Sequence, residues 1–257
     1  MKNSLLWLAF IAVVLGLVAF LNLRQQGREE LAVSGGPVVQ SSEAAIRHPI
    51  AAPTEMAEPL PELDASDGAV RERFAALLEQ QEFARLIRFD RLIRRLVVTV
   101  DNLDRPELPQ KLLPLRNPAG SFLVRGAEDQ LTLSSDNTKR YAPYVRLAEA
   151  VDSQTLVGAY TRFYPLFQQA YVDLGYPAGY FNDRLIEILD HLLATPAVRE
   201  PVRLTQPKVA YLFADPTLEK LSAGQKLLIR IGPENSAKIR VKLLELRRAL
   251  TNLPPQR

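Results

Sequence analysis

Cysteine is absent from this sequence of 257 residues. A chain without thiols has no disulfide framework, no thiolate metal site and no cysteine nucleophile. It also lacks the N-terminal cysteine to which lipid is attached in bacterial lipoproteins, so that class is excluded. The absence of cysteine does not identify the compartment, because it means only that the fold needs no oxidising one.

The short motifs of several enzyme classes are absent as well. No two glycines have the G-x-G spacing of a dinucleotide fingerprint, and no glycine precedes the Lys-Ser or Lys-Thr of a phosphate-binding loop. Neither H-E-x-x-H nor G-x-S-x-G occurs. Ser135-Asp136-Asn137 is similar to one motif of penicillin-binding enzymes, but no serine has a lysine three residues later. We therefore interpret the triplet as a turn, and we predict no cofactor.

One long apolar run is present near the amino end. From Leu5 to Leu23 only Asn22 is polar, and about 19 apolar residues suffice to cross a bilayer as a helix. The alternative is a cleaved signal peptide, whose apolar core is normally shorter and ends at a small-x-small site. Leu17-Val18-Ala19 matches such a site poorly. The run therefore predicts a transmembrane helix over residues 5–23, after a tail of residues 1–4, with the lipid bilayer as its partner.

The charges beside this helix do not fix its orientation. Lys2 lies on one side, and Arg24 and Arg28 lie on the other, so the positive-inside rule is nearly balanced. A short inner tail with the domain outside is the usual arrangement for such an anchor. We predict a single-pass protein of the bacterial inner membrane with a periplasmic domain, and the reverse topology remains the alternative.

Residues 24–62 have the composition of a linker. The segment shows no helical or strand period and contains six glutamates, three glycines and five prolines. Such a segment buries too little apolar surface to offset the entropy of ordering, so we expect a flexible, Pro-rich tether. His48 lies in this tether, and we interpret it as incidental.

The rest of the chain, residues 63–253, predicts one mainly helical globular domain with one small β-hairpin. Possible caps at Asp64 to Asp67 begin a helix that runs to about Gln80, and a second helix covers Arg85 to Val100. Alternating apolar residues on both sides of a glycine-containing loop predict the hairpin within Gly120 to Leu133. A further helix is expected from Tyr144 to Val151.

Apolar residues at helical spacing, or the residue patterns of helix starts, predict five more helices. One begins at Asp152 or Ser153 and carries an aromatic stripe, and another is capped by Asn182 and ends at Ala194. Asp215-Pro216 and Ser222 to Gln225 have the pattern of helix starts. Gly232 closes the helix that Ser222 begins, and Pro233 opens the last one. The apolar stripe of that last helix consists of Ile239, Leu243, Leu246, Leu250 and Leu253.

Three polar residues share one face of the helix that follows Asn182. Asp183, Glu187 and His191 are four residues apart, a spacing that aligns side chains along a helix. Carboxylates and an imidazole so placed could bind a divalent metal or share a proton. The other interpretation is the solvent face of an amphipathic helix, with the apolar set opposite. We assign no metal site and no catalytic residue.

Glycine, proline and aromatic residues are concentrated between Leu174 and Arg184. Tyr176, Tyr180 and Phe181 either pack over a tight corner between two helices or form an aromatic platform for a sugar or a peptide strand. We therefore predict six candidate ligand-binding residues, which are Tyr176, Tyr180, Phe181, Asp183, Glu187 and His191.

Eight runs of residues, in order along the chain, look familiar together. They are Val100–Leu103, Tyr164–Ala170, Leu174–Leu185, Asp190–Pro196, Gln206–Lys208, Phe213–Pro216, Leu221–Lys226 and Gly232–Asn235. Together they resemble an uncharacterised family of bacterial membrane-anchored proteins that carries a domain of unknown function. The similarity covers about Leu60 to Leu250. It implies the layout of anchor, linker and domain, and it supplies no activity and no catalytic residues.

Three functions fit these features. The first is a non-enzymatic interaction or scaffolding module of the cell envelope, which a tether would help to find a protein partner. The second is an enzyme that acts on an envelope polymer through Asp183, Glu187 and His191. The third is a cytoplasmic module that binds nucleic acid or lipid through basic helices such as Arg85–Arg95 and the last one. Because these basic residues are not interleaved with a convincing set of exposed aromatics, we expect no nucleic acid partner.

Overall fold

The computed structural model describes residues 45–50, 59–75, 84–127 and 130–253. The predicted tail of residues 1–4, the predicted transmembrane helix of residues 5–23 and most of the predicted linker lie outside the described residues. In the part that is described, no helix combines the length and the apolar character needed to cross a membrane.

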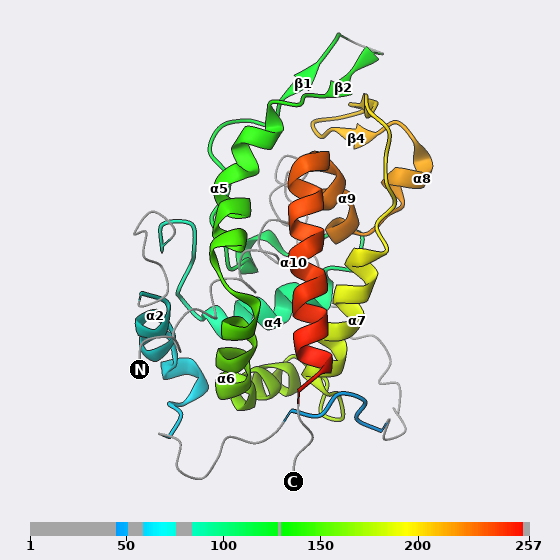
Figure 1. The fold of residues 1–257 in the computed structure, drawn as a ribbon. Helices are drawn as coiled ribbons and strands as arrows, with labels where there is room; N and C mark the ends of the chain where they lie inside the picture. Colours follow the sequence, from blue (N-terminus) through cyan, green and yellow to red (C-terminus); the bar gives the residue numbers. More distant parts are fainter. Residues whose placement is uncertain (1–44, 51–58, 76–83, 128–129, 254–257) are drawn as a thin grey trace.

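The described domain is mainly helical, as predicted (Figure 1). Its α-helices are α2 (Asp67–Ala75), α4 (Leu92–Asn102), α5 (Asn137–Ala150), α6 (Ser153–Asp173), α7 (Phe181–Leu193), α8 (Pro216–Glu219), α9 (Ala223–Arg230) and α10 (Pro233–Thr251), with short 3-10 helices η2 (Leu63–Ala65) and η3 (Gln110–Leu112). Helix α10 packs against α5, α6 and α7, while α4 crosses behind it and packs against α6 and α7.

Periodic apolar stripes build one large core, and the sequence predicted them well. The buried residues of α6 include Leu156, Tyr160, Phe163, Tyr164, Phe167 and Tyr171. Leu185, Ile186, Leu189 and Leu192 of α7 are buried, and so are Ile239, Leu243, Leu246 and Leu250 of α10. Burial of these stripes on facing helices supplies the main stabilisation of the fold.

The structure has two β-hairpins where the sequence predicted one. Strands β1 (Val124–Arg125) and β2 (Thr132–Leu133) form the expected pair, and β3 (Leu204–Thr205) pairs antiparallel with β4 (Leu212–Phe213). The hairpins lie beside one another at one end of the domain and cover a small second apolar cluster around Phe213. The second pair was missed because strands of two residues are too short to display an alternating pattern.

The start of α4 corrects the predicted helix from Arg85 to Val100. The helix begins only at Leu92, and Arg91 has a left-handed conformation with φ of 51°. Before it, the Arg88 N–H donates to the Pro114 carbonyl (2.7 Å) and the Arg116 N–H donates to the Leu86 carbonyl (2.8 Å). This pairing with an extended segment uses backbone groups that a continuous helix would need.

Helix caps were predicted with mixed success. Asp152, Asp215 and Ser222 accept hydrogen bonds from the N–H groups of Thr155, Thr217 and Gln225, as a cap does. Asn182 is not a cap, because α7 begins at Phe181 and the Asn182 side chain is buried within the first turn. Helix α5 begins at Asn137, directly after the turn at Ser135 and Asp136, and therefore earlier than the predicted Tyr144.

Candidate functional site at the α6–α7 corner

The turn between α6 and α7, residues 174–180, is a tightly tied corner. Gly175 ends α6 with φ of 114°, a conformation that favours glycine. The rings of Tyr171 and Tyr176 stack with centroids 4.6 Å apart. A side chain on Gly179 would meet the Tyr171 ring at 2.7 Å, so the chain can pass there only as glycine.

Gln168 of α6 fixes the first turn of α7. Its amide donates to the Gly179 carbonyl (2.7 Å), and its side-chain oxygen accepts from the Phe181 N–H (2.9 Å) and from the Tyr164 hydroxyl (2.9 Å). Phe181 itself is fully buried and stacks on Phe167. The structure therefore places Phe181 in the core, and the polar residues around it become the accessible part of the corner.

A short segment from the predicted linker, residues 45–50, lies against this corner. Asp183 accepts from two successive backbone amides, those of Arg47 (3.0 Å) and His48 (2.8 Å). The Asn182 amide donates to the His48 carbonyl (2.8 Å), and the Tyr180 hydroxyl accepts from the Ile50 N–H (2.7 Å). The backbone of the segment is thus held at four points by side chains that lie 130 to 136 positions away in the chain.

Two side chains of the segment also bind the domain. Ile50 is 3% exposed and belongs to the main core. Arg47 forms an ion pair with Glu187 in which the side chains stay 58% and 48% exposed. Because water screens so exposed a pair, its contribution is small, ~1 kcal/mol or less. The apolar anchor and the backbone contacts therefore dominate the docking of this segment.

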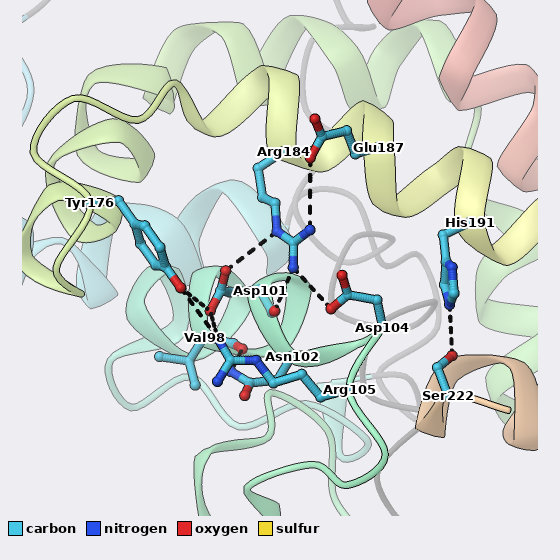
Figure 2. A network of polar contacts seen from close by, with 10 residues as sticks. All are labelled: Val98, Asp101, Asn102, Asp104, Arg105, Tyr176, Arg184, Glu187, His191 and Ser222. Atoms are coloured by element: carbon cyan, nitrogen blue, oxygen red, sulfur yellow. Dashed lines mark hydrogen bonds and ion pairs between the residues drawn. The ribbon is translucent and has the colours of Figure 1, made fainter. Parts of the chain in front are cut away.

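The other face of the α7 N-terminal half holds a buried polar network (Figure 2). Asp101, whose side chain is 4% exposed, accepts from the Arg184 Nε (3.3 Å), the Tyr176 hydroxyl (3.1 Å) and Arg105 (2.8 Å). Arg184 also donates to Asp104 (2.9 Å) and to the Asp101 carbonyl (2.8 Å). The network joins the end of α4 to the corner.

Burial and charge act in opposite directions within this network. Burial alone would lower the pKa of the Arg184 guanidinium, but attraction to Asp104 and Asp101 outweighs it and the pKa is raised. The pKa of Tyr176 is raised by burial, by the charge of Asp101 and by the hydrogen bond to it. Arg184 therefore stays charged and Tyr176 stays neutral at physiological pH, which suits a structural ion pair.

His191 belongs to a different part of the molecule. Its Nε2 lies 2.8 Å from the Ser222 hydroxyl, and its backbone carbonyl accepts from the Gln225 amide (3.1 Å). Ser222 and Gln225 are at the start of α9, and Figure 2 shows His191 pointing to Ser222, apart from Arg184 and Asp101. The four-residue spacing therefore does not bring His191 into one site with Asp183 and Glu187.

The candidate residues consequently divide into three groups. Tyr180, Asp183 and Glu187 contact the docked segment, Tyr176 joins the Asp101 network, and Phe181 and His191 serve the core and α9. Among the described residues no group of three His, Cys, Asp or Glu side chains is placed to hold a metal ion. The arrangement suits recognition of a peptide backbone better than acid–base chemistry.

Several residues of the corner were not predicted from the sequence as candidate site residues. Asp101 and Asp104 lie 83 and 80 positions from their partner Arg184. Residues 47–50 lie at least 130 positions from the side chains that hold them. An acidic residue inside the apolar stripe of α4 was the one local signal, because Asp101 follows the buried Val100.

A sequence model of a family described as a protein of unknown function, DUF3014, matches residues 92–247. The match begins with α4 and ends within α10, so it includes the corner and the Asp101 network. No curated protein and no solved structure matches the chain.

Proposed function

This chain belongs to the DUF3014 family of proteins of unknown function, and we propose that it is a membrane-anchored, non-enzymatic interaction module of the cell envelope. Its α6–α7 corner binds a short protein segment through backbone hydrogen bonds and one buried aliphatic side chain. A transmembrane helix over residues 5–23 fixes it in the bacterial inner membrane, and the domain lies in the periplasm.

The occupied corner is the observation that carries this proposal. Side chains of Tyr180, Asn182 and Asp183 bind the N–H and C=O groups of the docked backbone, while the core buries the aliphatic side chain of Ile50. Peptide-binding sites combine these same two elements, main-chain hydrogen bonds and side-chain pockets. A tether adds to this function, since it raises the local concentration of the domain near partners at the membrane.

The alternative of an enzyme acting on an envelope polymer has less support. It needs Asp183, Glu187 and His191 to converge on one substrate atom. Asp183 instead caps two amides, Glu187 pairs with Arg47, and His191 contacts Ser222. No further observation favours this alternative.

The membrane part of the proposal is tested by thiol labelling in cells. The sequence has no cysteine, so Ile46→Cys supplies a single thiol at a position that is 53% exposed. A reagent that does not cross the inner membrane should label it once the outer membrane is permeabilised, and the protein should stay in the membrane fraction. Labelling only after cell lysis, or a soluble mature protein, would contradict the proposed location.

The interaction part is tested by photo-crosslinking in cells. A photoreactive residue in place of Leu174, which is exposed beside the corner, should give a discrete adduct with an envelope protein. The matched control is Val241, which is exposed on α10. Adducts that are the same from both positions, or absent from Leu174 under several growth conditions, would overturn the proposal.

A further inference from the structure

We infer that the corner recognises protein segments of the sequence Arg–any residue–Pro–aliphatic, and that residues 47–50 of this chain are its resident competitor. The inference rests on the proposed function, because it names the ligand class of the same site. A partner segment of this chemistry would replace the resident one rather than enter an empty groove.

The backbone contacts hold a chain that bends at Arg47 and His48, and they require no particular side chain. Asp183 accepts from two successive backbone amides, Asn182 donates to the carbonyl of residue 48, and Tyr180 accepts from the amide of residue 50. Residue 49 makes none of these contacts and is a proline, which has no N–H to satisfy. Proline therefore suits this place in the bound segment.

The side-chain contacts supply the selectivity. Ile50 is 3% exposed, and a buried aliphatic side chain of this size improves binding by roughly tenfold to a hundredfold over one left in water. The ion pair of Arg47 with Glu187 is exposed at both ends, so its loss should weaken binding by only about twofold to fivefold. The aliphatic position therefore discriminates most and the arginine discriminates less.

Competition follows from the covalent connection between the segment and its site. A segment that is covalently joined to its site by a few residues can reach an effective concentration on the order of millimolar, which a free ligand must exceed. Release would also change the reach of the domain. While the segment is docked, residues 24–44 connect the predicted anchor to the docked segment. When the segment is released, the whole predicted linker of residues 24–62 connects the anchor to the domain.

The test is a titration of the full chain, in detergent micelles, with a fluorescent peptide of residues 43–52. Ile50→Asp is chosen to undock the resident segment, and Ile46→Asp is the matched control at an exposed position of the same segment. The Ile50→Asp chain should bind the peptide at least ~10-fold more tightly than the unaltered chain and the Ile46→Asp chain. A thermal melt of each variant establishes that the domain is folded.

Altered peptides test the sequence rule on the Ile50→Asp chain. A peptide with aspartate in place of its isoleucine should not bind, and one with alanine in place of its arginine should bind about twofold to fivefold more weakly. A peptide with glutamate at the arginine position should regain affinity on a chain that also carries Glu187→Arg. Equal binding of a scrambled peptide would overturn the sequence rule.

The failure of this inference differs from the failure of the proposed function. If no peptide binds the folded Ile50→Asp chain at millimolar concentration, the ligand class is wrong, although crosslinks from Leu174 would still support an interaction module. If the peptide binds as expected and no partner is crosslinked in cells, the ligand class stands and the proposed function fails. A folded Ile50→Asp chain that binds no more tightly than the Ile46→Asp control would overturn the role of the resident segment.

Discussion

The two halves of α7 carry similar polar residues but use them differently. In the N-terminal half, Asp183 and Glu187 contact the docked segment, while Arg184 reaches the buried Asp101 (Figure 2). In the C-terminal half, Asp190 pairs with Arg247 of α10 and His191 contacts Ser222 of α9. The first half binds a segment that enters from outside the helical core, and the second half ties neighbouring helices together.

This difference shows what helical spacing can and cannot reveal. Residues four apart lie on one face of a helix, yet over two or more turns that face meets different neighbours. Asp183 and His191 are separated by about 12 Å along the axis at 1.5 Å per residue. Alignment on one face is therefore weak evidence for one site.

The largest effect is expected where the two halves share the core. Leu189 lies in the buried stripe of α7, and Leu189→Asp would bury an unpaired charge. We expect the domain to unfold, which corresponds to a loss of ~4 kcal/mol or more. Glu187→Asp on the exposed face is the control and should leave the fold intact. A normal melting temperature for Leu189→Asp would show that the helix faces the other way.

Loss of the buried Asp101 carboxylate should destabilise the domain more than loss of an exposed residue of the same network. Asp101→Ala leaves the half-buried Arg184 with the more exposed Asp104 and Glu187 as its acidic partners, and we expect a loss of ~3 kcal/mol in unfolding free energy. Arg105→Ala removes an exposed partner of the same carboxylate and should cost under ~1 kcal/mol. Urea denaturation measures both values. Equal losses from the two variants would mean that burial does not set the strength of this network.

Alkaline pH should weaken the packing beneath the N-terminal half. Burial raises the pKa of Tyr164, whose ring lies 5.4 Å from that of Tyr180. An unfolded tyrosine ionises at about pH 10, so the neutral folded form is favoured below that pH and its contribution is lost as pH rises above it. Each pH unit above 10 should cost ~1.4 kcal/mol for this residue. The slope of stability against pH should be shallower by that amount in Tyr164→Phe. An unchanged slope in this variant would exclude Tyr164 as the cause.

The smallest effect is expected from the contact of His191. His191→Ala removes the hydrogen bond to Ser222 and should cost ~1 kcal/mol. Peptide binding to a chain that also carries Ile50→Asp should not change, because His191 lies outside the segment-binding half. Asp183→Asn in the same background should weaken peptide binding severalfold. The comparison of the two halves would fail if both variants weakened binding alike.

Local periodicity allowed much of the fold to be predicted. The stripes of α6, α7 and α10 were read directly from the sequence because burial repeats every three or four residues. The second hairpin has strands of only two residues, too short to show a period, and the start of α4 depends on pairing with a segment that is distant in the chain. Ile87 pairs with Leu115 in this way.

The candidate site was predictable only in part. Aromatic density and helical spacing pointed to Tyr180, Asp183 and Glu187, and in the structure these three residues contact the docked segment. The segment itself has the composition of a linker, and Arg47 and Glu187 are 140 positions apart. No pattern in a single sequence connects such residues, so the partner of the corner could come only from the fold.

Amide hydrogen exchange tests the docking of residues 45–50 most directly. In the full chain, the N–H groups of Arg47, His48 and Ile50 donate to Asp183 and Tyr180, so each should exchange at least ~10-fold more slowly than in a free peptide of the same sequence. Asp183→Asn should restore fast exchange at Arg47 and His48. Exchange of all three amides at the rate of the free peptide in the unaltered chain would contradict the account.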